Sequence, residues 1–189
     1  MRSASRVISL DDLGRERGAR VVTRRVLVDS DDGALIATLD MTSILRAHGG
    51  FSRHLVASEA KPCINGEAAR PQIFDYTIPP QTALLFRLNG DMNDLHADPD
   101  AAREAGFPQP ILHGMATFGI ANYMLLRALN RSARTLRELE ARFTAPVFPG
   151  DTLRIKAHAS DGGQRARFEV YAPDRHVKVL SRGVARFEG

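Results

Sequence analysis

The sequence is poor in cysteine and lysine, and it has no long apolar run. Cys63 is the one cysteine among 189 residues, which excludes an intrachain disulfide framework and a cysteine zinc site. The first residues turn acidic before any apolar segment, and no window approaches the roughly 20 apolar residues of a membrane span. These absences predict a cytoplasmic protein with no membrane partner. At 43% hydrophobic residues, the chain can form one sizeable core or two small ones.

The charge of the chain is carried by arginine. A net charge of +4 arises from 26 basic residues, of which only Lys61, Lys156 and Lys178 are lysines. The arginines are scattered and do not alternate with aromatic residues in the way that stacks bases, so no nucleic-acid partner is expected. An anionic small ligand, such as a nucleotide-bearing thioester, and a solvated arginine-rich surface both remain open.

Alternating apolar and polar residues at both ends of the chain predict antiparallel strands. Residues 17–46 form a hairpin pattern around an Asp-Gly turn at 31–33, whereas no segment before Arg17 is expected to supply a strand. Residues 152–160 alternate as a half-buried strand, and two further runs to residue 187 complete a meander. The similarity of the two hairpins in length and turn position suggests an internal duplication.

Two helices are predicted between these strands. Asp98, Pro99 and Gly106 have the spacing of an N-cap, a first helical residue and a stop signal. Residues 112–129 are apolar on nearly every face, which predicts a helix buried on all sides. We expect an antiparallel sheet of four or more strands wrapped around this central helix, an α+β fold.

The stretch FRLNGDMNDLHADP, which follows a β-like run, concentrates polar side chains in a short loop. Asp91 and His96 lie five residues apart, close enough for both to reach one water. An isolated pair of this kind is most often turn chemistry or an exposed contact. Asn93 could hold a water or the pair in place through its amide.

The residues that follow the loop offer a further candidate. Gly114 opens the long apolar helix, where its N–H is unpaired and the missing Cβ lets a carbonyl oxygen approach. Its alternative role is tight packing of the helix on the sheet. His113 and Pro110 beside it are candidates for substrate contact, although His113 could simply hydrogen-bond the loop.

The remaining histidines are expected at the surface: His48, His54, His158 and His176. No second histidine or carboxylate recurs at ligand spacing near Asp91 and His96, so no metal is expected. No cofactor is predicted either.

The segment GDMNDLHADPDAAREAGFPQPILHG and the later RFTAPVFPGDTLRIKA resemble the hydratase 2 family, also called the MaoC-like dehydratases. The resemblance covers residues 73–189 and implies a catalytic hotdog domain that adds or removes water across C2–C3 of an acyl-coenzyme A thioester. GALIATLDMTSILRAHGGFS is more weakly similar to the end of an amino-terminal hotdog repeat. Residues 1–60 would then be an incomplete repeat of strands alone, with a linker at 61–72, giving a double hotdog with an incomplete first half.

The resemblance assigns the catalytic dyad to Asp91 and His96 and the oxyanion hole to Gly114. Asp94 departs from the family pattern, which usually has proline there. Aspartate at this position could loosen the loop or add a charge beside the dyad.

Three functions remain open: an (R)-specific enoyl-CoA hydratase or 3-hydroxyacyl-CoA dehydratase, a dehydratase acting on acyl carrier protein, and a non-catalytic or partner-dependent thioester-binding subunit. We expect the chain to pair, as a homodimer or with another hotdog chain, because a lone sheet would leave Leu153 and Ile155 partly uncovered.

Overall fold

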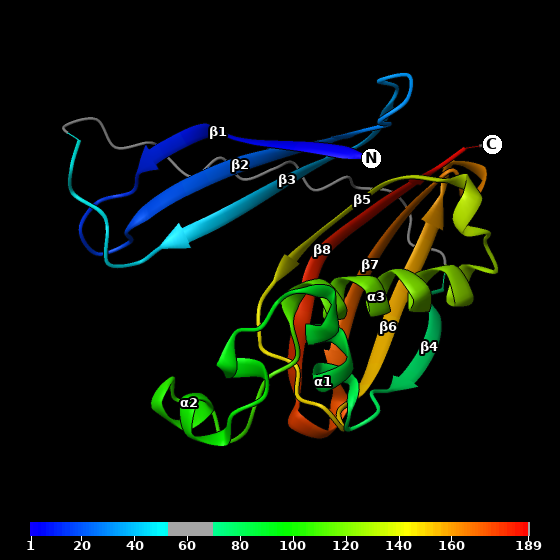
Figure 1. Cartoon of the computed structure of the whole chain (residues 1–189). Helices are drawn as coiled ribbons and strands as arrows, with labels where there is room; N and C mark the ends of the chain where they lie inside the picture. The colour runs from blue at the N-terminus through cyan, green and yellow to red at the C-terminus, as the bar shows by residue number, and fades with distance from the viewer. Residues whose placement is uncertain (53–69, 189) are drawn as a thin grey trace. The chain divides into compact units, whose positions relative to one another are not determined.

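The computed structural model describes residues 1–52 and 70–188, and the contacts divide the chain into two compact units, Met1–Ile64 and Asn65–Gly189. Figure 1 shows a sheet in each of them. The predicted linker lies almost entirely outside the described residues, as does His54.

The first unit is a three-stranded antiparallel meander in the order β1-β2-β3, formed by β1 (Arg2–Asp12), β2 (Ala19–Val28) and β3 (Leu35–Leu45). The hairpin of β2 and β3 confirms the pattern around the Asp-Gly turn, where Gly33 has φ +75°. The expectation that no strand precedes Arg17 was wrong. β1 is mostly polar and exposed, and pairing with β2, rather than apolar alternation, makes it a strand.

The two faces of the first sheet differ in polarity. In the register of β2 and β3, alternate positions of β3, including Leu39, Met41 and Leu45, share one face, which is mostly apolar although Arg25 lies opposite Leu39. The other face carries ion pairs between Arg20 and Asp11 and between Arg24 and Asp40. Residues 1–52 contain no helix to cover the apolar face.

The second unit is a five-stranded antiparallel sheet in the order β4-β6-β7-β8-β5. Its strands are β4 (Gln72–Thr77), β5 (Leu136–Phe143), β6 (Thr152–Ser160), β7 (Arg165–Ala172) and β8 (Val177–Phe187). The long helix α3 (Gly114–Leu129) lies across this sheet (Figure 1). A sheet wrapped around one helix is the predicted hotdog architecture, and it confirms the α+β prediction.

Short helical segments connect these elements: α1 (Thr82–Phe86), η1 (Arg87–Asn89), η2 (Asp94–His96), α2 (Pro99–Glu104), η3 (Ala133–Thr135), η4 (Asp161–Gly163) and η5 (Pro173–Arg175). The predicted caps of α2 are confirmed, since Asp98 accepts a hydrogen bond from the Asp100 N–H and Gly106 has φ +86°. The run before Gly90 is helical, not β-like. A short apolar run such as TALLF fits either structure, and its packing decides between them.

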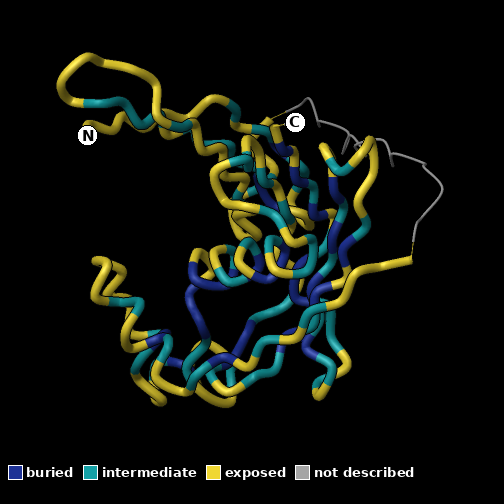
Figure 2. Tube along the Cα trace, turned by 90° about the vertical axis from the view of Figure 1, so that its right-hand side faces the viewer, coloured by how far each residue is buried: buried dark blue, intermediate teal, exposed yellow. Residues whose placement is uncertain are grey.

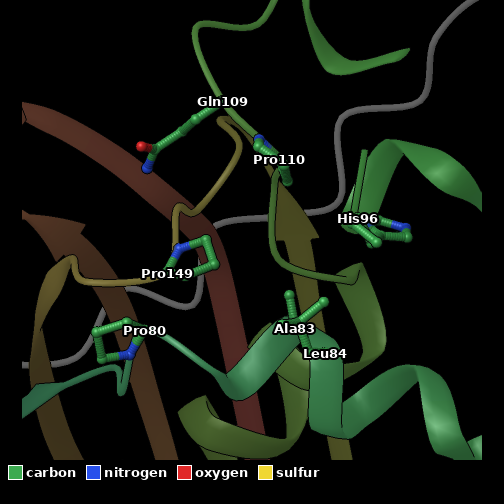
Figure 3. A pocket seen from close by; sticks show the side chains of 8 residues that line it. Pro80, Ala83, Leu84, His96, Gln109, Pro110 and Pro149 are labelled. Carbon is green, nitrogen blue, oxygen red and sulfur yellow. The ribbon is translucent and has the colours of Figure 1, made fainter. Parts of the chain in front are cut away.

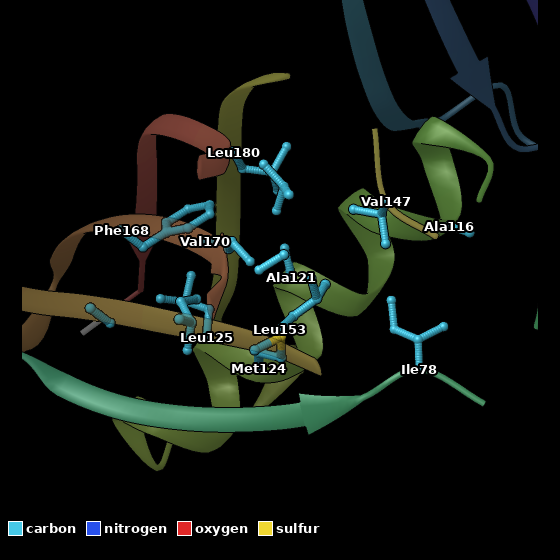
Figure 4. Close-up of a cluster of buried hydrophobic side chains, with 14 of the residues drawn as sticks. Ile78, Ala116, Ala121, Met124, Leu125, Val147, Leu153, Phe168, Val170 and Leu180 are labelled. Atoms are coloured by element: carbon cyan, nitrogen blue, oxygen red, sulfur yellow. The ribbon is translucent and has the colours of Figure 1, made fainter. Parts of the chain in front are cut away.

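The core of the second unit lies between α3 and the sheet. Ala121, Met124 and Leu125 of the helix pack against strand residues that include Leu153 and Ile155 (Figure 4). Both strand residues are 0% exposed, so the expectation that they stay partly uncovered was wrong. The domain's own helix covers them, and they give no reason for pairing.

The opposite face of α3 is exposed, contrary to the prediction of burial on all sides. Met115 and Tyr123 are 54% and 47% exposed, and Gly119 and Arg127 lie on the same face. Figure 2 shows the helix buried on one side and exposed on the other. One sheet can cover only one face of a helix, so the remaining apolar residues face outward. None of the described helices has the length and hydropathy needed to cross a membrane.

Candidate active site at the start of the central helix

The loop that carries the predicted dyad is shaped by two local signals. Gly90, with φ +103°, ends the helical segment that precedes the loop, a conformation that glycine adopts without strain. Asn93 then caps η2 by accepting a hydrogen bond from the Leu95 N–H at 3.1 Å. The Asn93 side chain therefore shapes the turn that presents His96.

His96 is 8% exposed, and its ring is anchored from one side. Its Nδ1 lies 2.9 Å from the carbonyl oxygen of Ile111. Because a carbonyl can only accept, Nδ1 carries the proton and Nε2 carries the lone pair in neutral His96. The Ile111 N–H also donates to the Leu95 carbonyl at 3.2 Å, so the two segments hold each other.

Asp91 is exposed, and its carboxylate lies close to two histidines. One side-chain ligand atom from each of Asp91, His96 and His113 lies within 4.8 Å of the other two. The structure thus brings together the predicted pair and adds His113 to it. The spacing along the sequence did not reveal this third member, because tertiary folding brings residue 113 back to the loop.

His113 and Gly114 mark the start of α3. The chain before the helix is fixed by the Leu112 N–H, which donates to the Val147 carbonyl at 2.7 Å. The His113 side chain does not cap the helix, which leaves the first N–H groups available to a ligand. A Cβ built on Gly114 would meet only the Phe143 ring, at 3.7 Å, so tight packing does not require glycine there.

The loop between β5 and β6 supports the start of α3, and sequence reasoning missed the residues that hold it. Asp151 accepts hydrogen bonds from the Phe148 N–H at 2.9 Å and from Arg175 Nη2 at 2.8 Å. Arg175 also donates to the Pro146 carbonyl at 2.7 Å and lies over the Phe148 ring. This network fixes the backbone around Val147, and the PGD sequence before β6 was its available signal.

A cavity of about 270 Å³ opens beside His96. Its lining is mostly apolar: Pro80, Ala83, Leu84, His96, Ala97, Gln109, Pro110 and Pro149 (Figure 3). Of the two residues predicted to contact substrate, Pro110 is among the lining residues and His113 is not. A small apolar pocket with one imidazole in its wall suits an acyl group that carries its reactive carbons to His96.

The three clustered side chains are poorly arranged for a metal ion. The His96 and His113 rings are stacked, with centroids 3.7 Å apart and planes 23° apart. Lone pairs lie in the ring planes, so an ion about 2.0–2.1 Å from a nitrogen of each ring would lie out of plane for both. The arrangement favours proton transfer over metal binding.

The other histidines within the described residues have no part in this cluster. His48 and His176 are exposed, as predicted, and His158 is half-buried on β6. Asp94 begins η2, and its carboxylate lies 4.0 Å from Arg87 Nη2. Arg87 also donates to the Met92 carbonyl at 3.3 Å, which ties the loop to the preceding helical segment.

The fold and the site define a hotdog domain in which a carboxylate and two imidazoles cluster near the start of the central helix, and one of the imidazoles lines a small cavity. The family profile described as "MaoC like domain" matches residues 65–179. The chain belongs to this family, as the resemblance in its sequence predicted.

Comparison with individual proteins agrees with this assignment. The chain is 37% identical over 171 residues to 3-hydroxyacyl-thioester dehydratase Y of Mycobacterium tuberculosis, covering 89% of this chain and 59% of that protein. It is 35% identical over 189 residues to enoyl-CoA hydratase ChsH3 of the same organism, covering 96% and 63%. A MaoC-like dehydratase structure from Phytophthora capsici superimposes with a TM-score of 0.82 at 27% identity, covering 98% and 64%. The chain thus spans about three fifths of these relatives.

Proposed function

We propose that the protein reversibly hydrates trans-2-enoyl-CoA to (3R)-hydroxyacyl-CoA. The observation that carries the proposal is the cluster of the Asp91, His96 and His113 side chains, in which His96 lines an apolar cavity and His113 directly precedes α3. The names of the two curated relatives, a thioester dehydratase and an enoyl-CoA hydratase, support the same chemistry. No cofactor takes part, since adding water to a conjugated thioester requires only proton transfer and charge stabilisation.

The dyad moves the protons in this proposal. The free Nε2 of His96 and the Asp91 carboxylate hold a water that attacks C3. The pair accepts one proton from the water and returns one proton to C2, so that a hydroxyl and a hydrogen replace the double bond. The dyad then stands in its starting protonation state. Asn93 supports the reaction by shaping the turn that presents His96.

The start of α3 stabilises the charge on the thioester oxygen. Attack at C3 moves negative charge onto this oxygen, and we assign the Gly114 N–H and the positive end of the helix dipole to receive it. Glycine leaves the space that the oxygen occupies. Pro110 lines the cavity that receives the acyl group.

The proposed assembly is a pair of hotdogs. β4 and β5 are the edges of the five-stranded sheet, and the exposed face of α3 carries Met115 and Tyr123. An open sheet edge and an exposed apolar helix face both favour association. We assign residues 1–60 as an incomplete repeat, because β1-β2-β3 repeats the antiparallel order of β6-β7-β8, and we propose a homodimer or a complex with another hotdog chain.

The exposed groups also support a second candidate, a thioester-binding subunit that needs a partner for activity. Asp91 is exposed in the isolated chain, whereas proton transfer to carbon is most effective in a site from which water is excluded. Assays of the chain alone and with candidate hotdog partners separate the two functions. Comparing coenzyme A and acyl-carrier-protein thioesters separates the two carriers.

The test is the hydration of crotonyl-CoA and longer enoyl-CoAs, measured by single turnover. Asp91→Asn and His96→Gln keep the side-chain size and should each lower the rate by about 10²–10⁴-fold. Gly114→Ala should also lower the rate, because the added methyl group occupies the space of the thioester oxygen. His48→Gln, at an exposed histidine, is the matched control and should leave the rate unchanged. Activity near wild type in either dyad variant would contradict the proposal.

A further inference from the structure

His113 is a buried polar residue that is not among the residues lining the cavity. It is 1% exposed and precedes the first residue of α3. Its ring lies between Phe86, at a centroid distance of 4.8 Å, and His96, at 3.7 Å. The His113 ring is therefore stacked on His96, with planes 23° apart, and packs at a tilt of 50° against Phe86 of α1.

The hydrogen bonds of His113 define its tautomer. Nε2 lies 3.2 Å from the backbone carbonyl oxygen of Asp91, which can only accept, so Nε2 carries the proton. Nδ1 is buried and has no partner among the described residues. A proton there would leave a charged donor buried and unpaired. His113 is therefore the neutral Nε2–H form.

The electrostatic surroundings favour the same form. Burial lowers the pKa of His113 below its ordinary value, and the hydrogen bond to the Asp91 carbonyl opposes this only in part. The coulombic influence of His96 and Arg87 lowers the pKa further, the Asp91 carboxylate opposes it, and the net shift is downward.

His113 contacts both members of the dyad, His96 and Asp91. The stack fixes the plane of the His96 ring, while the Ile111 carbonyl fixes its Nδ1. The Nε2–H of His113 holds the backbone of Asp91, whose side chain is otherwise in an exposed loop. We propose that His113 is a positioning residue that fixes Asp91 and His96 relative to each other and does not bind the substrate. This inference rests on the proposed hydratase function.

Two substitutions separate the two contacts. His113→Phe keeps a ring for stacking but loses the donor to Asp91, and His113→Gln keeps a donor but loses the ring. Each should lower kcat by about 10–100-fold, because small displacements of reacting groups are costly, and should change KM by less than about twofold. A raised KM with unchanged kcat would show that His113 binds substrate and would overturn the proposal. Wild-type kinetics in both variants would overturn it as well.

Nitrogen NMR of the histidine rings tests the geometry without substrate. In the wild-type protein at neutral pH, His113 should be the neutral Nε2–H form and His96 the Nδ1–H form. His113→Gln should mix the His96 tautomers, whereas His113→Phe should preserve the Nδ1–H form because it keeps the stack. A protonated His113, or the opposite tautomer, would overturn the inference even if a variant failed to fold. A wild-type protein with the expected tautomers and no hydratase activity would contradict only the proposed function.

Discussion

The two units of the chain contain similar meanders but have very different interiors. In the second unit, α3 and the sheet enclose a continuous apolar core. In the described part of the first unit, Ala19 is the one buried hydrophobic residue, and the most notable buried group is the carboxylate of Asp12. The comparison shows that strand pairing alone does not build a core. A helix across the sheet does, because it removes a whole sheet face from water.

In the first unit, hydrogen bonds to the buried Asp12 carboxylate hold two loops together. The carboxylate accepts from the Gly14 and Gly50 N–H groups at 2.8 Å and from the Ser52 N–H at 2.5 Å. Gly49 cannot carry a side chain here, since a Cβ would lie 2.1 Å from the Gly14 carbonyl oxygen. One buried anion therefore joins the turn after β1 to the segment that follows β3.

The largest expected difference between the units concerns their apolar residues. Leu125→Ala removes a fully buried side chain of α3 and should destabilise the second unit by about 2–5 kcal/mol. Met41→Ala, on the apolar face of β3, should change stability by less than about 0.5 kcal/mol. Denaturant unfolding, with hydrogen exchange resolved by unit, measures both. A loss above about 1 kcal/mol for Met41→Ala would show that the face is covered in solution.

Through Asp12, the stability of the first unit should depend on pH. The Gly50 N–H lowers the pKa of this carboxyl more than burial raises it, and the N–H groups of Ser52 and Gly14 add to the lowering. The pKa of an aspartate in the unfolded chain is about 3.9. Because the pKa of Asp12 is lower in the folded state, its ionised form stabilises the fold at pH values above about 3.9. This stabilisation is lost as the pH falls through the folded-state pKa.

Asp12→Asn should therefore destabilise residues 2–45 at pH 7, and its difference from wild type should shrink below about pH 4. Hydrogen exchange of β1 to β3 measures this in the whole chain. Asp32→Asn, in the exposed hairpin turn, is the matched control. If the loss of stability caused by Asp12→Asn stayed the same from pH 7 to below about pH 4, the charge of Asp12 would not stabilise the unit.

The comparison also shows which features can be predicted from sequence. The caps of α2 depend on Asp98, Pro99 and Gly106, which are neighbours in the chain, so their spacing was sufficient. The short helix α1 was misread because its conformation depends on packing. β1 was missed because its pairing with β2, and not its own pattern, determines it.

The site shows the same division between local and tertiary signals. Asp91 and His96 share one loop, so their proximity could be predicted, and the sequence motif pointed to their chemistry. The stack of His113 on His96 joins residues 17 positions apart, and the bond between Arg175 and Asp151 joins different loops. Such contacts leave no periodic signal. The exposed face of α3 could not be predicted either, because the apolar composition of a helix does not reveal which of its faces are covered.

Asp94, an exposed aspartate of the second unit, should contribute least to stability and activity. Asp94 is exposed and begins η2, and the ion pair that its carboxylate forms among the described residues is a long contact with Arg87, which contributes at most about 1 kcal/mol. No hydrogen bond from its N–H is found within residues 70–188. Asn93 before it has φ −58° and ψ 127°, a conformation that a following proline accepts. The free N–H of Asp94 and the backbone of Asn93 are therefore both compatible with proline at position 94.

Asp94→Pro should accordingly stabilise the protein by about 0.4–1 kcal/mol and leave hydratase activity within about twofold, because the turn that presents His96 is unchanged. Leu95→Pro is the matched control. It removes the N–H that donates to Asn93, so it should destabilise η2 and lower activity. Thermal unfolding and crotonyl-CoA hydration measure both variants. A large loss of activity in Asp94→Pro would mean that the Asp94 charge serves the dyad, and the contrast between the buried Asp12 and the exposed Asp94 would then fail.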